Sequence, residues 1–384
     1  MRVRTADIRG QGTGVEWIST DGAEVYFSSE TRTSAGVSLS LQVYQAETGE
    51  VRTVASGIAI SQEDVCTFFD FPEETVLVMS GGESEAVVSR VSKESGAETV
   101  RAHLQFFGNL YGCLALDETR LLLITEESEA HRKVFQKYRE LTGFSRILFL
   151  YDMKDQQYYY LKDPRLCGLC AEQFRIYDLN GQRQLLILQT YGSESEKRYC
   201  YRNRKYMEEE IRDDIWICPL IDFVISVKSG EAHLPLEPVM GSGTNGMLRY
   251  AGMDAASLYF RATYFPTGDQ RICAVDKTTR EVTALLELNG EAEAVRYLVD
   301  ADTARVYCIR DRGDVYEVEG LLNTGDCFSY PRELGTMLAC VDGRYIVTQV
   351  EDGKGGFYLC DTVTSVSERR FCRFSVQDGT LVLY

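Results

Sequence analysis

Residues 41–54 read LQVYQAETGEVRTV, two alternating segments joined by the polar turn Glu47-Thr48-Gly49-Glu50. Apolar and polar residues that alternate on either side of such a turn predict a β-hairpin. The same design recurs in residues 272–286, ICAVDKTTREVTALL, and in residues 224–236, VISVKSGEAHLPL. Looser versions occupy residues 87–100, 147–161, 315–330 and 357–371. We therefore expect a hairpin that is repeated along most of the chain.

A second recurring element, a short apolar run after a polar turn, alternates with these hairpins. The runs are Val25–Phe27, Val76–Met79, Leu121–Ile124, Leu185–Leu188, Leu258–Phe260, Val306–Ile309, Tyr345–Val347 and Leu381–Tyr384. Self-similarity at intervals of a few tens of residues is the mark of a repeat architecture. Each repeat supplies two hairpins, and four-stranded antiparallel blades are the units of a β-propeller. The sequence predicts an all-β fold, a β-propeller with short helical inserts, in which residues 1–384 form a single domain.

The last apolar run decides the number of blades. Leu381–Tyr384 follows its predecessor too closely to leave room for another complete blade. We therefore predict seven blades, with residues 380–384 as a closing strand. Residues 3–8 are expected to join the last blade, because an open ring would leave sheet edges unpaired. Eight blades, the last one incomplete, is the alternative.

Two inserts, at about residues 128–143 and 193–214, interrupt the repeat. In the first, Val134, Phe135, Tyr138 and Leu141 have the spacing of one helix face. The second interleaves basic residues with tyrosines and then turns acidic at residues 208–210, which predicts a loop followed by a short helix. Inserts in repeat proteins tend to lie on one face, often the binding face.

Composition narrows the class of protein and of partner. The chain of 384 residues has a net charge of −17, which argues against DNA as a partner because a phosphate backbone requires a basic face. RNA is a weaker possibility, through stacking on tyrosines beside arginines. No apolar stretch reaches the length that spans a bilayer, and no secretory signal opens the chain. We expect an acidic cytoplasmic protein whose twelve cysteines are mostly reduced core residues.

The tyrosine-rich hairpins, fed by strands that end in VYF or LYF, resemble the repeats of bacterial β-propellers of unknown function. TolB-like and low-density-lipoprotein-receptor-like propeller repeats are similar. The Tyr-Trp-Thr-Asp signature of the receptor repeats is absent, and so is the Trp-Asp dipeptide at strand ends. The resemblance implies the fold and carries over no functional residue.

Few residues have the pattern of a chemical site. The three histidines, His103, His131 and His233, lie in a predicted outer strand, the first insert and a hairpin, so none is expected at the axis. Cys167 and Cys170 form the only C-x-x-C pair, which has no second pair to complete a zinc site and no helix to support a redox role. We interpret them as thiols in a connection between blades, although a redox or metal role stays open.

The glycine-rich stretch Gly241–Gly246 could cradle a phosphate only if a helix followed it. Residues 247–250, Met-Leu-Arg-Tyr, predict a strand instead, so we interpret the stretch as a link between blades. The sequence therefore predicts neither a metal site nor a cofactor.

The function predicted from these patterns is a non-catalytic module that binds a protein or a ligand. Arginine and tyrosine are enriched at interface hot spots. The expected contacts are five residues of the second insert: Arg198, Tyr201, Arg202, Arg204 and Tyr206. A small molecule in the central channel is a further possibility. The alternative is an enzyme, a lyase or a lactonase-type hydrolase, that acts on a sugar-like substrate in the central funnel.

Overall fold

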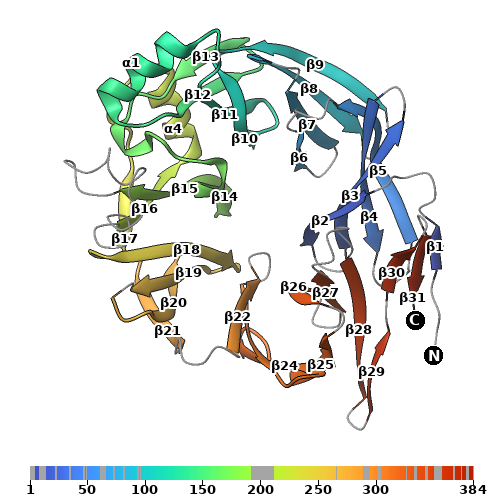
Figure 1. The fold of residues 1–384 in the computed structure, drawn as a ribbon. Helices are drawn as coiled ribbons and strands as arrows, with labels where there is room; N and C mark the ends of the chain where they lie inside the picture. Colours follow the sequence, from blue (N-terminus) through green and yellow to red (C-terminus); the bar gives the residue numbers. More distant parts are fainter. Residues whose placement is uncertain are drawn as a thin grey trace. The chain divides into compact units, whose positions relative to one another are not determined.

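The computed structural model describes residues 5–383 apart from gaps, of which the longest are 8–13, 61–65, 192–211, 289–294 and 350–356. Most of the described residues are in β-strands (Figure 1), and the fold is a β-propeller. The strands form six four-stranded sheets and one seven-stranded sheet. The chain divides into two compact units, residues 1–62 with 251–255 and 291–384, and residues 63–250 with 256–290.

In the first unit, two sheets contain four strands that follow one another along the chain. The first sheet consists of β2 (Gly14–Asp21), β3 (Glu24–Thr33), β4 (Gly36–Gln45) and β5 (Glu50–Ile60). The second consists of β22 (Val295–Asp300), β23 (Arg305–Asp311), β24 (Val315–Leu322) and β25 (Cys327–Pro331). Tyr307 and Tyr330 are fully buried in the core of this unit.

The seven-stranded sheet of the first unit brings the two ends of the chain together. It contains β26 (Thr336–Val341), β27 (Tyr345–Gln349), β28 (Phe357–Ser365), β29 (Glu368–Cys372), β30 (Phe374–Gln377), β31 (Thr380–Leu383) and β1 (Thr5–Asp7). Ala6 of β1 pairs with Leu381 of β31 in antiparallel register. The predicted closing strand and its N-terminal partner are thus confirmed, and both lie in the sheet of β26–β28.

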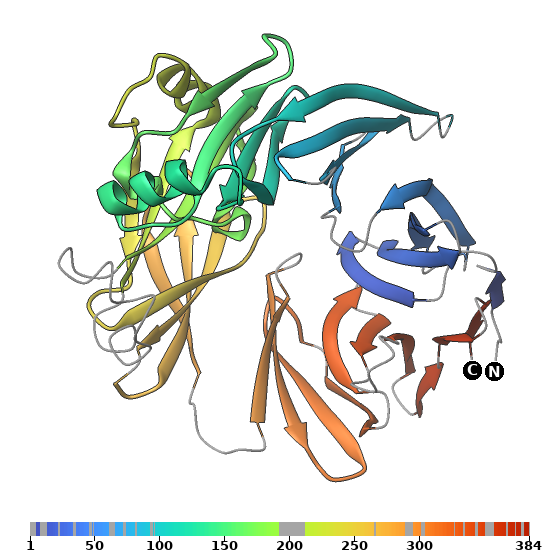
Figure 2. The same ribbon diagram turned by 45° about the horizontal axis from the view of Figure 1, so that its top comes forward.

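The second unit contains four sheets of four strands each (Figure 2). Their strands are β6 (Cys66–Asp70), β7 (Glu74–Ser80), β8 (Glu85–Ser92) and β9 (Glu98–Gln105); β10 (Asn109–Asp117), β11 (Arg120–Glu126), β12 (Ile147–Asp152) and β13 (Gln157–Tyr160); β14 (Phe174–Leu179), β15 (Gln182–Tyr191), β16 (Arg212–Pro219) and β17 (Glu237–Gly241); and β18 (Gly246–Met253), β19 (Ser257–Tyr264), β20 (Asp269–Asp276) and β21 (Val282–Leu288). The apolar runs fall on second strands, such as β11 and β15, whose side chains are almost entirely buried.

The predicted hairpins at residues 41–54, 87–100, 147–161, 272–286, 315–330 and 357–371 are confirmed as paired strands. The hairpin predicted for residues 224–236 is wrong. Its first half belongs to helix α4 (Leu220–Lys228), which buries Leu220, Phe223, Val224 and Val227 against the core of the second unit. Those positions have the i, i+3, i+4, i+7 spacing of a helix face. The β-branched residues in the stretch favour a strand, but burial of this apolar face outweighs that preference and stabilises the helix.

The helix predicted in the first insert is confirmed as α1 (Arg132–Thr142), although only half of its predicted apolar face is buried. Phe135 and Tyr138 lie in the core, whereas Val134 is 43% and Leu141 is 76% exposed. Phe135 packs against Gly108, where a Cβ atom would lie 2.4 Å from the phenyl ring. No helix in the described part of the chain is long and apolar enough to cross a lipid bilayer.

Candidate ligand pocket

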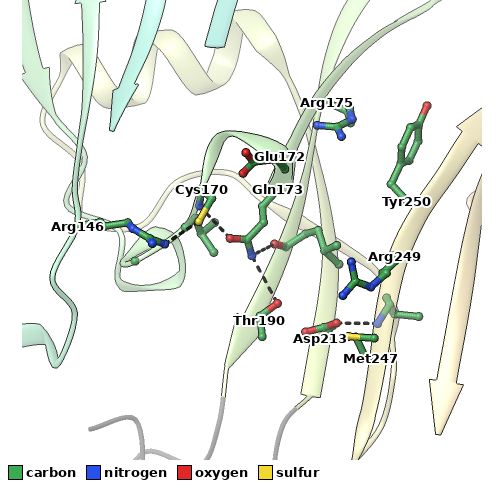
Figure 3. A pocket seen from close by; sticks show the side chains of 14 residues that line it. Arg146, Cys170, Glu172, Gln173, Arg175, Thr190, Asp213, Met247, Arg249 and Tyr250 are labelled. Carbon is green, nitrogen blue, oxygen red and sulfur yellow. Dashed lines mark hydrogen bonds between the residues drawn. The ribbon is translucent and has the colours of Figure 1, made fainter. Parts of the chain in front are cut away.

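The second unit contains a pocket of about 400 Å³ that is lined by strands of two consecutive sheets and by two connecting segments (Figure 3). Arg146, which precedes β12, lines one side, and the connection from β13 to β14 lines the next. Strands β14, β15, β16 and β18 provide the remaining walls. The lining residues are Arg146, Gly168, Leu169, Cys170, Glu172, Gln173, Arg175, Leu188, Thr190, Asp213, Met247, Leu248, Arg249 and Tyr250. A volume of this size matches the pockets that hold small organic molecules.

The connection between β13 and β14 is held in place by local hydrogen bonds. It contains two short 3₁₀ turns, η1 (Pro164–Leu166) and η2 (Ala171–Gln173). The side chain of Gln173 accepts a hydrogen bond from the Cys170 amide at 2.9 Å and donates one to the Leu188 carbonyl at 2.8 Å. Gly168 has a φ of +77°, and a Cβ atom there would lie 2.2 Å from the ring of Phe144. Only glycine fits at that position, which fixes the backbone conformation of the connection there.

Three arginines from three different elements line the pocket. Arg146 donates to Cys170 Sγ at 2.7 Å and lies over the ring of Tyr111, 3.8 Å from its centroid. Arg175 donates to the Phe174 carbonyl at 2.7 Å and lies 5.3 Å from the ring centroid of Tyr250. Arg249, on β18, is exposed toward solvent. In the described part of the chain, no carboxylate lies within ion-pair distance of any of the three guanidinium groups.

Asp213 lies at the pocket wall and is only 1% exposed. Its backbone exchanges hydrogen bonds with Ser242, and its Oδ2 accepts one from the Leu248 amide at 2.6 Å. Burial raises the pKa of Asp213 to about 6, although the Leu248 amide, the nearby Thr190 hydroxyl and the charge of Arg249 act in the opposite direction. Among the described residues, Oδ1 is buried without a well-formed hydrogen bond. A buried polar atom without a partner is rare and calls for an explanation.

The five predicted contact residues, Arg198, Tyr201, Arg202, Arg204 and Tyr206, lie outside the described residues. The ends of that insert are described. Tyr191 pairs with Arg212, and Thr190 pairs with Asp213. Residues 212–214, which the sequence assigned to the insert, therefore belong to β16. Because Thr190 and Asp213 both line the pocket, the insert leaves and rejoins its sheet at the pocket.

The two cysteines of the C-x-x-C pair lie in the connection between two sheets, as predicted. Both carry reduced thiols, and Cys167 is buried. Burial raises the pKa of Cys170, so its thiol is protonated near neutral pH, which disfavours a nucleophilic role. Among the residues that the structure describes, no group of three or more His, Cys, Asp or Glu side chains could hold a metal ion.

The histidines are structural where their contacts are described. His103 lies in β9, an outer strand, as predicted. His131 precedes α1 rather than lying inside it, and its Nδ1 lies 3.1 Å from the hydroxyl oxygens of Ser84 and Ser128. His233 follows α4. None of the three lines the pocket.

Sequence patterns gave no indication of Asp213 or Arg249 as site residues. The stretch Gly241–Gly246 is a link between sheets, as predicted, and the strand β18 follows it. That strand carries Arg249 among apolar residues, and Asp213 precedes the apolar core residues of β16. A charged residue inside a buried strand pattern was the available signal, but it identifies a site only when the neighbouring sheet is known.

Comparison with known proteins supports the fold and no specific activity. No protein-family model matches the chain, and no curated protein matches it in sequence. A solved prolyl endopeptidase is 11% identical with a TM-score of 0.50, over 98% of this chain and 50% of that one, so the chain spans about half the length of that enzyme. The β-propeller domain of the Trilobed protease from Pyrococcus furiosus is 9% identical with a TM-score of 0.48, over 95% and 93% of the two chains. An oligogalacturonate lyase in complex with manganese is 12% identical with a TM-score of 0.48, over 99% and 90%. The predicted resemblance to β-propeller proteins is confirmed at the level of the fold alone.

Proposed function

We propose that the chain is a non-catalytic propeller module that binds a small molecule in the pocket formed around Asp213 and Arg249. The observation that carries the proposal is the cavity of about 400 Å³ whose walls come from two consecutive sheets and the segments that precede β12 and β14. Hydrogen bonds of Gln173 join the connection before β14 to β15, and a hydrogen bond of Asp213 joins β16 to the start of β18. A pocket with such fixed walls is largely pre-formed, which lowers the entropic cost of binding.

The chemistry of the lining supports binding rather than turnover. The thiol of Cys170 is protonated, and one oxygen of Asp213 is already engaged by a backbone amide. The protonated thiol is therefore not presented as a free nucleophile. The apolar side chains of Leu169, Leu188 and Leu248 give the pocket surface that an organic ligand can cover.

The test is a fragment screen followed by ligand-detected NMR on the full chain and on two variants. Thr190→Tyr fills the pocket without a change of charge, and Thr283→Tyr makes the same change on exposed strand β21 as a matched control. We expect fragments that bind the wild type and Thr283→Tyr but not Thr190→Tyr. A screen without such fragments contradicts ligand binding, and chemical conversion of a bound compound contradicts the non-catalytic half of the proposal.

We further propose that the insert between β15 and β16 contacts a protein partner. The described ends of the insert flank the pocket, so a partner on the insert and a ligand in the pocket would be neighbours. A pull-down with the full chain, compared with a chain in which residues 193–211 are replaced by a short glycine-serine turn, tests this. An identical set of captured proteins contradicts it.

A further inference from the structure

Three arginines and two carboxyl groups, those of Glu172 and Asp213, line the pocket, and none of the arginines forms an ion pair with a described carboxylate. Arg146 and Arg175 satisfy part of their hydrogen-bonding capacity with sulfur and backbone oxygen, and each also lies over an aromatic ring. Arg249 has no hydrogen bond from its guanidinium group within the described residues. The whole chain carries a charge of −17. Three guanidinium groups that face one cavity of such an acidic protein are an exception to its charge pattern.

Arg261 on the neighbouring strand β19 adds to this excess of positive charge. It is half-buried, and burial together with the charge of Arg249 lowers its pKa. No carboxylate in the described ranges forms an ion pair with it. Two like charges near each other, one of them partly desolvated, destabilise the folded chain unless an anion lies close to both.

The buried carboxyl group of Asp213 does not supply that anion effectively. Its Oδ2 is committed to the Leu248 amide, and its Oδ1 faces no well-formed donor in the part of the chain that the structure describes. The charged groups around it are Arg249 on β18, Asp214 on its own strand, Arg175 on β14 and Glu172 of η2. Figure 3 shows the Arg249 side chain beside Asp213, with Arg175 and Glu172 farther along the same pocket.

We propose that the pocket binds the carboxylate or phosphate group of a small molecule, held by the guanidinium groups of Arg175 and Arg249 beside the buried carboxyl group of Asp213. This assignment of a ligand class rests on the proposed function. The planar guanidinium fork of arginine matches both kinds of oxyanion and can bind either in a bidentate manner. The apolar lining would cover the rest of the molecule.

The position of Asp213 makes binding dependent on protons. An anion next to an ionised carboxylate is repelled, whereas the protonated carboxyl group can donate a hydrogen bond from Oδ1 to the anion. Because the pKa of Asp213 is raised to about 6, the protonated form is within reach at mildly acidic pH. Affinity should therefore rise as the pH falls through this range.

The experiment titrates the full chain with two pairs of probes by isothermal calorimetry. Benzoate is compared with neutral benzamide, and dimethyl phosphate is compared with neutral trimethyl phosphate, so that each anion has an uncharged analogue of similar shape. Measurements at about pH 5 and about pH 8 bracket the titration of Asp213. The variants are Arg249→Gln and Arg175→Gln, with Arg312→Gln, an exposed arginine of the other unit, as the control.

We expect at least one anion to bind more tightly than its neutral analogue, and to lose on the order of ten- to hundredfold in affinity in the two pocket variants but not in Arg312→Gln. The same anion should bind on the order of tenfold more tightly at the lower pH, and Asp213→Asn should remove that dependence. Selectivity between the two anions then identifies the ligand as a carboxylate or a phosphate compound.

Three results would overturn the inference. They are equal binding of the charged and neutral probes, unchanged affinity in both pocket variants, and no detectable binding of either anion. If neutral compounds bind and Thr190→Tyr abolishes their binding, the pocket is a ligand site of another class. The proposed function then stands while the anion inference fails.

Discussion

Asp163 and Asp213 are two buried aspartates in the same unit of the propeller, and their surroundings differ. Each is at most 1% exposed, and each accepts a hydrogen bond from a backbone amide that lies farther along the chain, that of Leu234 at 2.8 Å and that of Leu248 at 2.6 Å. Asp163 also accepts hydrogen bonds from the backbone amide and the guanidinium group of Arg165, the shortest at 2.6 Å. Asp213 has instead the nearby Thr190 hydroxyl and the charge of Arg249, with which it forms no ion pair.

The electrostatic outcome is opposite at the two positions. Hydrogen bonds and the charge of Arg165 outweigh burial and lower the pKa of Asp163, whereas burial dominates and raises the pKa of Asp213 to about 6. The guanidinium group of Arg165 is itself fixed by the Leu234 carbonyl and lies over the ring of Trp216. A buried carboxylate with a complete set of partners stabilises the fold, whereas an incomplete set of partners leaves hydrogen-bonding capacity for a ligand.

Removal of the carboxylate of Asp163 should have the largest effect. Asp163→Ala leaves the guanidinium group of Arg165 and the amide of Leu234 without their acceptor, and the loss of one partner of a buried ion pair costs about 3–5 kcal/mol. Urea denaturation near neutral pH measures the free energy of unfolding. Asp178→Ala, an exposed position on β14, is the matched control and should change it by less than about 0.5 kcal/mol. A loss of less than about 1 kcal/mol in Asp163→Ala would show that its ion pair is not structural.

The second prediction concerns the pH dependence of stability in Asp213→Asn. The pKa of Asp213 is raised in the folded chain, so its contribution to stability is fully present below the unfolded pKa and is lost as the pH rises through about 6. Asparagine has no such penalty and keeps an oxygen for the Leu248 amide. We expect Asp213→Asn to be more stable than the wild type by up to about 3 kcal/mol near pH 8, with no gain near pH 4.

Asp163→Asn is the matched control for that experiment, because the sign reverses. The pKa of Asp163 is lowered, so its contribution is present above the unfolded pKa and is lost as the pH falls through the folded pKa. Its asparagine variant should be destabilised near pH 8 and approach the wild type at low pH. Parallel pH profiles for the two variants would remove the distinction between the two aspartates.

Sequence patterns predicted the propeller because alternation and turn chemistry are local, and each hairpin contains both of its strands. Helix α4 was missed because Ile221, Val224 and Ile225 have high strand propensity, and the need to bury one face decides its structure only in the folded chain. The site was not predictable in the same way. Burial by the neighbouring strands raises the pKa of Asp213, and the amide of Leu248, which lies in the next sheet, acts in the opposite direction. Nothing in the sequence around Asp213 distinguishes it from Asp163.

The smallest expected effect belongs to the arginines of the comparison. Arg165→Gln should destabilise the chain, since Gln cannot supply the bidentate contact to Asp163. Arg249→Gln should leave stability unchanged or raise it by about 0.5 kcal/mol, because it relieves the repulsion with Arg261. Thermal unfolding at low and high salt separates the cases, because salt screens the repulsion at exposed Arg249 more than the buried contacts of Arg165 with Asp163. A gain in Arg249→Gln that disappears in high salt would identify a position where charge is kept at the expense of stability, as expected of a binding residue. If Arg249→Gln lost as much stability as Arg165→Gln, Arg249 would support the fold in the same way as Arg165.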